Sequence, residues 1–169
     1  MRAVAFTASL FASTAAQAEV KSATASGFVV ESRTVVAVPP AVAYAMLTRV
    51  GAWWIPSHTY SGKGASLSLD PRAGGCFCES WAGGSVEHGR VIAARPGQQL
   101  RLSGALGPLQ GEALTGTLTW TLKPAPNGTE IVQTYSVAAY VAGGADKYAS
   151  PVDQVMAQQL AAFTKALAR

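Results

Sequence analysis

The chain has 169 residues, of which 13 are basic and 9 acidic, and its formal net charge is +4. This length suits one domain with a sizeable core. The basic residues are scattered along the chain, which argues against a nucleic-acid-binding surface. No dinucleotide fingerprint, phosphate loop or nucleophile elbow occurs, so no cofactor is predicted.

The first residues have the pattern of a secretory leader. Arg2 precedes an apolar run that ends in Ala16-Gln17-Ala18, a small-x-small sequence typical of a signal-peptide cleavage site. We expect residues 1–18 to be removed on export across the inner membrane, most simply to a bacterial periplasm; an N-terminal helix is the alternative. No later stretch reaches about 18 consecutive apolar residues, so no membrane span is predicted.

The next segments predict a lead-in, a strand and two short helices. Residues 19–27 are small and polar and are expected to be a flexible lead-in. Residues 28–38 are rich in valine and threonine, which favours a strand that ends at Pro39-Pro40. Short helices or turns are then expected at 41–48 and 50–55.

From residue 66 the pattern changes to period two. Turn dipeptides, among them Asn127-Gly128, separate the alternating segments, which predicts an antiparallel meander. In one segment, leucines and Trp120 share one face and threonines the other, so one side of the sheet is buried and one meets water. The six strands are expected at 66–70, 75–81, 85–94, 99–106, 114–123 and 130–139.

A long helix is expected at the C-terminus. Ser150-Pro151-Val152-Asp153 predicts its start, with Ser150 as the N-cap. Apolar residues then recur at helical spacing and form a stripe that faces the sheet. The resulting class is α+β, with a curved antiparallel sheet of about seven strands wrapped around the C-terminal helix. A cavity between sheet and helix is the natural place for a site.

Several motifs in this order resemble a known superfamily. They are Arg33-Thr34-Val35, Ala37-Val38-Pro39-Pro40, Trp53-Trp54 and Asp70-Pro71-Arg72-Ala73-Gly74-Gly75. Their order resembles the START-like or SRPBCC superfamily, in the branch related to activators of the heat-shock 90 ATPase and to polyketide cyclases. The resemblance implies the helix-grip fold for one domain over residues 28–169. An exported chain would not meet a cytosolic chaperone, so co-chaperone activity is not expected.

The strand that carries both cysteines departs from that branch, which usually has alternating basic and aromatic residues there. Phe77, Glu79 and Trp81 share one face of this strand. If that face is buried, the carboxylate needs a partner or a ligand. Glu79 is therefore a candidate acid or base, with His88 as a second candidate, and pairing with an arginine is the alternative. Which face of the strand 85–94 points inward stays open.

The two cysteines lie on the opposite face of the same strand. Cα atoms of Cys76 and Cys78 would be about 6.5–7 Å apart on a regular strand, at the upper edge of what a disulfide spans. Unreactive packing thiols are therefore favoured over a strained or bulge-assisted disulfide, which an oxidising compartment would promote. Metal ligation is the third alternative, but His58 and His88 lack zinc-type spacing to the cysteines, so no metal site is predicted.

These observations favour an exported protein that binds a small hydrophobic or aromatic molecule between sheet and helix. One alternative is an enzyme resembling polyketide cyclases or dehydratases, in which Glu79 with His88 moves a proton. Another is an interaction module without an open pocket. The residues expected to contact the ligand are Trp53, Trp54, Phe77, Glu79, Trp81, Trp120, Gln133, Tyr135, Val155, Met156 and Phe163.

Overall fold

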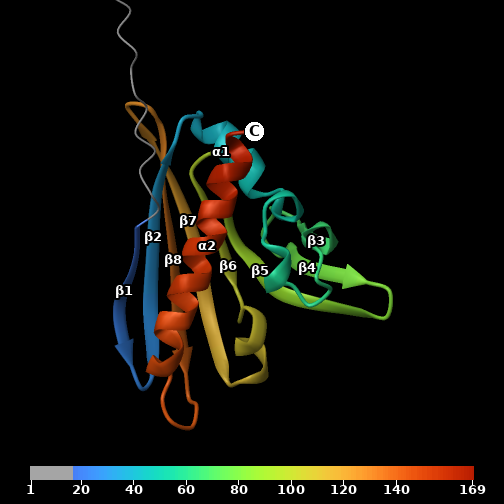
Figure 1. Cartoon of the computed structure of the whole chain (residues 1–169), viewed down its shortest axis with the longest axis vertical. Helices are drawn as coiled ribbons and strands as arrows, with labels where there is room; N and C mark the ends of the chain where they lie inside the picture. Colours follow the sequence, from blue (N-terminus) through green and yellow to red (C-terminus); the bar gives the residue numbers. More distant parts are fainter. Residues whose placement is uncertain (1–16) are drawn as a thin grey trace, which may run out of the picture.

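A computed structural model describes residues 17–169, so nearly all of the expected leader at 1–18 lies outside the described residues. The described chain forms one antiparallel sheet of 8 strands in the order β1-β2-β8-β7-β6-β5-β4-β3. The long helix α2 (Ala149–Leu167) lies along one face of this sheet (Figure 1). The predicted α+β helix-grip architecture is confirmed.

The expected meander and helices form close to their predicted positions. The strands are β1 (Gln17–Thr24), β2 (Gly27–Val36), β3 (Leu67–Leu69), β4 (Cys76–Trp81), β5 (Gly84–Arg95), β6 (Gln99–Ser103), β7 (Leu114–Ala125) and β8 (Gly128–Ala139). Helix α1 (Pro40–Leu47) follows β2, and the short 3-10 turns are η1 (Val50–Ala52), η2 (Pro56–His58), η3 (Gly64–Ser66), η4 (Gly107–Gly111) and η5 (Asp146–Tyr148).

The flexible lead-in expected at 19–27 is instead mostly the edge strand β1. It pairs antiparallel with β2, with Val20 opposite Val30 and Thr24 opposite Gly27. The segment is small and polar, so its own strand preference is weak, and pairing with a neighbouring strand overrides that preference. This strand accounts for the difference between about seven expected strands and 8 observed.

Helix α2 begins differently from the prediction. Tyr148 is its N-cap, no side chain caps it, and the expected capping by Ser150 is absent. The turn η5 leads straight into the helix, so Ser150 already lies inside it. The apolar stripe is confirmed, since Met156, Leu160 and Phe163 are buried. Within residues 17–169 no helix has the length and apolar character needed to cross a membrane.

A buried polar link joins the sheet to α2. The indole Nε1–H of Trp120 on β7 donates to Oε1 of Gln133 on β8, at 2.8 Å. The Gln133 amide in turn donates from Nε2 to the carbonyl oxygen of Met156, at 2.9 Å. Both side chains are buried, so the link fixes the position of α2 over the sheet at Met156.

Candidate functional site

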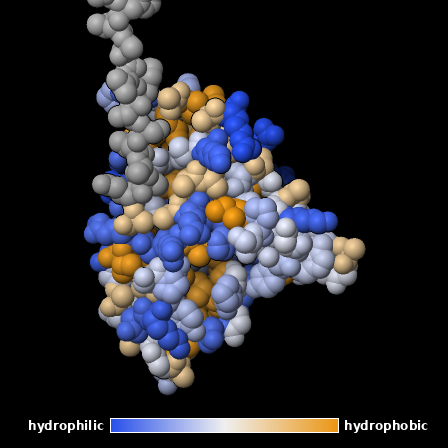
Figure 2. Space-filling model, viewed as in Figure 1, coloured by the Kyte–Doolittle hydropathy of each residue, from blue (hydrophilic) through white to orange (hydrophobic). Residues whose placement is uncertain are grey.

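A cavity of about 410 Å³ lies between the sheet, the first half of α2 and two loops. In the view of Figure 1, hydrophobic residues reach the surface in the middle of this face, next to hydrophilic ones (Figure 2). A volume of this size fits a small organic molecule. The apolar side chains of the wall include those of Trp54, Leu106, Leu109, Val152, Val155 and Met156, and its tyrosine and histidine rings are those of His58, Tyr60, His88, Tyr135 and Tyr148.

The wall loop, residues 55–61, is held at both ends by buried side chains. At one end, the Ile55 N–H donates to Oε1 of Gln159 on α2, at 3.0 Å. At the other end, the N–H groups of Tyr60 and Ser61 donate to Glu79, at 3.0 and 2.5 Å. The Tyr60 hydroxyl also donates to the carbonyl oxygen of Gly107, at 2.9 Å. This bond joins the wall loop to the second loop of the cavity wall, residues 106–109.

Glu79 is a fully buried carboxylate with three donors. Besides Tyr60 and Ser61, Nε2 of His88 lies 3.1 Å from its Oε2, and the side chain has 0% exposure. Burial by itself raises the pKa of Glu79, but the hydrogen bonds from Ser61, Tyr60 and His88 outweigh it and hold the pKa below its ordinary value. Glu79 is therefore ionised at neutral pH and accepts hydrogen bonds only.

His88 presents a neutral imidazole to the cavity. Burial lowers the pKa of His88, and the neighbouring Glu79 opposes this only in part. Because the carboxylate accepts only, Nε2 carries the ring proton and Nδ1 keeps its lone pair. His88 lines the cavity and Glu79 does not. Within the described chain no protein group hydrogen-bonds Nδ1, so a bound molecule finds an acceptor or base there.

A β-bulge turns His88 inward. Phe77 on β4 pairs with Gly89 and Cys78 pairs with Glu87, so His88 is the extra residue of β5. The bulge changes which residues of β5 face the core, because one strand then has two residues opposite one. A Cβ on Gly89 would lie 2.9 Å from the carbonyl oxygen of Ser103, and only glycine permits this close approach.

This bulge answers the question left open about β5. His88, at the bulge, and Val91, after it, are both buried, whereas Arg90 is exposed. The expected alternative in which an arginine pairs with Glu79 is wrong. Arg90 instead donates to Glu87 on the outer face, from Nε at 3.0 Å.

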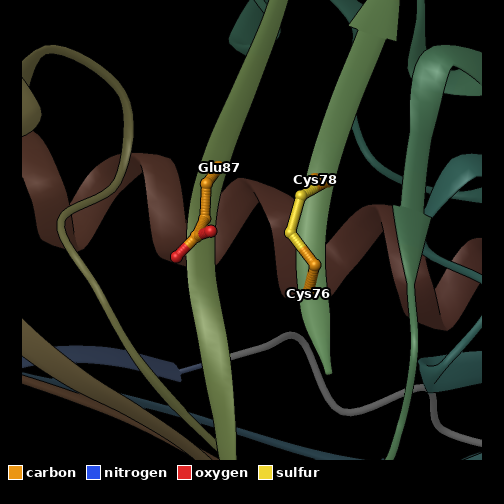
Figure 3. A group of neighbouring side chains, drawn as sticks. All are labelled: Cys76, Cys78 and Glu87. Carbon is orange, nitrogen blue, oxygen red and sulfur yellow. A yellow bond between two sulfur atoms is a disulfide. The ribbon is translucent and has the colours of Figure 1, made fainter. Parts of the chain in front are cut away.

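Cys76 and Cys78 form a disulfide, so the expectation of free packing thiols is wrong (Figure 3). Their Cα atoms are 5.4 Å apart, closer than on a regular strand. A register shift lies beside Cys78. The bond is therefore the bulge-assisted disulfide that the sequence analysis gave as the less favoured alternative. The carboxylate of Glu87 lies next to the pair, and one of its oxygens and the two sulfurs are within 4.8 Å of one another.

Apart from Glu79 and Trp81, the predicted contact residues divide into three groups. The cavity wall includes Trp54, Tyr135, Val155 and Met156. Phe77 lies behind this wall, with its ring centroid 5.3 Å from that of Trp54 and 5.0 Å from that of His88. The buried residues outside the cavity lining are Trp53, Trp120, Gln133 and Phe163. Whether any of these residues contacts a ligand stays a prediction.

Trp81 does not point inward as expected, since it is 37% exposed. Its ring lies 2.5 Å from the position a Cβ would take on Gly84. The ring therefore packs over the glycine on the other side of the β4–β5 turn. Trp81 is the last residue of β4, beyond the part of the sheet that the wall loop covers.

Tyr135 lines the cavity, but its hydroxyl has protein partners. It accepts from the Leu106 N–H at 3.2 Å and donates to the Gly104 carbonyl at 3.0 Å. Burial raises the pKa of Tyr135 to about 12. The ring packs on Gly116, where a Cβ would lie 2.5 Å from it. Tyr135 thus shapes the cavity and fixes the loop at 104–106.

Sequence reasoning missed the roles of Tyr60, Ser61 and Tyr148. Tyr60 and Ser61 meet Glu79 through backbone N–H groups from positions 19 and 18 residues away. Backbone donors are present at every non-proline residue, so no residue type marks them. Tyr148 precedes α2 and carried no periodic signal.

Acidification is expected to lower the free energy of unfolding through this pair. The pKa of folded His88 lies below 6.5 and that of folded Glu79 below 4.5. The unfolded chain then binds more protons, so stability rises with pH. The contribution of this pair to stability is fully present above about pH 6.5. It falls below that pH as His88 is protonated, and below about pH 4.5 as Glu79 is protonated.

Urea unfolding at about pH 7 and about pH 5.5 checks this expectation. His88→Gln removes the titrating group and should shrink the loss of stability between these two conditions. An equal loss in His88→Gln and in the parent protein would contradict the assignment.

Several solved structures are similar to this one. Protein MLL2253 from Mesorhizobium loti superposes with a TM-score of 0.62 at 21% identity, over 83% of this chain and 97% of that one. An uncharacterized protein from Rhizobium leguminosarum has a TM-score of 0.62 at 18% identity, over 92% and 99%. CalU16 from Micromonospora echinospora has a TM-score of 0.60 at 15% identity, over 90% and 84%.

No protein-family model matches the chain, and no curated protein does. At these identities the structural likeness shows the fold alone. The chain therefore shares its antiparallel sheet and C-terminal helix with these proteins.

Proposed function

We propose that the protein binds a small, largely apolar molecule in the cavity beside His88. The observation that carries this proposal is the cavity itself, of about 410 Å³, with a mostly apolar wall from α2 and the two loops. Such a wall favours an aromatic or aliphatic ligand, since apolar surface removed from water stabilises the complex.

The polar atoms of the cavity restrict the ligand further. Tyr60 and Tyr135 use their hydroxyls on backbone carbonyls, whereas Nδ1 of His88 has a free lone pair. A ligand that carries one hydrogen-bond donor, such as a phenol or an alcohol, satisfies that acceptor, and a donor-free analogue of the same shape should bind more weakly.

Binding of a hydrophobic fluorescent dye, 1-anilinonaphthalene-8-sulfonate, tests this function. Native mass spectrometry of protein mixed with the dye is a second readout. Val155→Trp fills the cavity from α2 and should weaken dye binding at least about tenfold. Val42→Trp adds the same ring on the exposed side of α1, where Val42 is 48% exposed, and should leave binding unchanged. No dye binding, or equal binding by both variants, would contradict the proposal.

The Glu79–His88 pair favours proton transfer as a second candidate function. A ketone bound beside His88 would give an α-proton to Nδ1, and the same nitrogen would return one from solvent, so the ketone is regenerated. In heavy water this exchanges hydrogen for deuterium in a probe such as acetophenone, measured by proton NMR. His88→Gln should abolish the exchange while the probe still binds; exchange that persists rules this candidate out.

We also propose that residues 1–18 are a leader removed on export, which places the mature protein in the periplasm. Cleavage after Ala18 would turn the backbone N–H of Glu19 into an ammonium group. On α2, burial raises the pKa of Asp153, and the Glu19 N–H acts against that rise. Oδ1 of Asp153 is buried and has no hydrogen-bond partner in the described chain. The new ammonium group would therefore lie near a carboxylate that lacks a partner.

A chain that starts at Glu19 is therefore expected to be more stable than one that starts at Gln17. The difference should be about 1 kcal/mol, or about 2–4 °C in Tm. Thermal unfolding of both chains measures it, and Asp153→Asn in each chain is the control. If the Tm values of the two Asp153→Asn chains differ by as much as those of the two parent chains, the ammonium group does not interact with Asp153.

A further inference from the structure

The disulfide and the base of the cavity lie at one irregularity of β4 and β5. Cys76 and Cys78 flank Phe77, and Glu79 follows directly. The register shift between these strands falls at the same residues and makes His88 the extra residue. The covalent bond on the outer face and the hydrogen-bonded pair on the inner face thus share a few residues of backbone.

The disulfide holds β4 in a contracted form at this point. Its Cα atoms are 5.4 Å apart, whereas alternate residues of an extended strand are about 6.5–7 Å apart. Opening the bond lets β4 lengthen by about 1 Å. One hydrogen bond, 3.1 Å long, ties Glu79 to His88. Such bonds weaken steeply beyond their normal range, so a displacement of this size disrupts them.

The bond is accessible to a reductant from outside the cavity. Both cysteines are partly exposed, and their sulfurs face the outer carboxylate of Glu87 (Figure 3). A dithiol can supply the two electrons and two protons required. The Sγ–Sγ bond breaks, each sulfur becomes a thiol, and the reductant leaves as its own disulfide.

We propose that the Cys76–Cys78 disulfide positions His88 against Glu79, so that its reduction loosens this pair and changes the base that the cavity offers. The positioning itself is independent of the proposed function. Only its consequence for a ligand rests on that function.

The chain contains 2 histidines, which makes the test direct. In protein with isotope-labelled histidine, NMR compares the titration of His88 in the oxidised and in the reduced protein. Glu79 raises the pKa of His88 against the effect of burial. Reduction by dithiothreitol should therefore lower the pKa of His88 by about 0.5 pH units or more.

An unchanged His88 titration after complete reduction would overturn the proposal. A variant with Cys76→Ser and Cys78→Ser should titrate like the reduced protein and ignore dithiothreitol. If that variant does not fold, the oxidised and reduced parent proteins still decide the question. The dye-binding measurement is separate, so a cavity that binds nothing would refute the proposed function and leave the positioning role standing or falling on the NMR result.

Discussion

Replacing Glu79 with alanine is expected to lower the free energy of unfolding by about 3–5 kcal/mol. The change removes the acceptor of three donors at once: the N–H groups of Tyr60 and Ser61 and Nε2–H of His88. The carboxylate is fully buried, so water cannot replace it without opening the wall loop. Denaturant unfolding measures the loss, and the cavity should bind the dye more weakly because the loop is no longer held.

Two variants sharpen this result. Glu79→Gln keeps the shape but sets an amide NH₂ where an acceptor is needed, so about 2 kcal/mol should be lost. Glu87→Ala removes a carboxylate from the outer face of β5, where its contact is the exposed ion pair with Arg90, and should cost less than about 1 kcal/mol. Equal losses for Glu79→Ala and Glu87→Ala would contradict the role assigned to Glu79.

Trp120→Ala is the second large effect expected, also about 3–5 kcal/mol. Trp120 is 1% exposed, and its Nε1–H is the partner of Gln133. The substitution leaves a cavity under α2 and a buried amide oxygen without a donor, and Tm should fall by about 10 °C. Thermal unfolding checks this.

Trp81→Ala is the matched control, because it removes the same side chain from a hairpin end where Trp81 is 37% exposed. Its effect should stay below about 1 kcal/mol. Trp120→Phe fills most of the space and should fall between the two. The same loss for Trp81→Ala and Trp120→Ala would mean that burial does not determine the cost.

The sequence predicted the regular parts of the fold because their signals are local. On β7, Leu118 and Trp120 are buried while Thr119 between them is not, as the alternation required. The Asn127-Gly128 signal predicted the hairpin between β7 and β8, where Ala125 pairs with Gly128 and residues 126–127 form the turn. Each of these features depends on residues within a few positions of one another.

The irregular parts of the site escaped prediction for the opposite reason. A period-two pattern assumes constant parity, so it cannot place His88, which lies at a bulge. The same shift brought Cys76 and Cys78 within bonding distance. The inward direction of Glu79 followed from its aromatic neighbour Phe77, but its donors come from a loop far away in the sequence.

Glu79 holds the wall loop through main-chain N–H groups of that loop. The carboxylate accepts from the main-chain N–H groups of residues 60 and 61, and any residue except proline supplies such a group. Side chains at 57–60 line the cavity without taking part in this anchor. On the proposed function, substitutions at 57–59 would change which molecule the cavity accepts and leave the carboxylate and the imidazole in place. On the proposed function, ligand recognition by these side chains could therefore change independently of the Glu79–His88 pair.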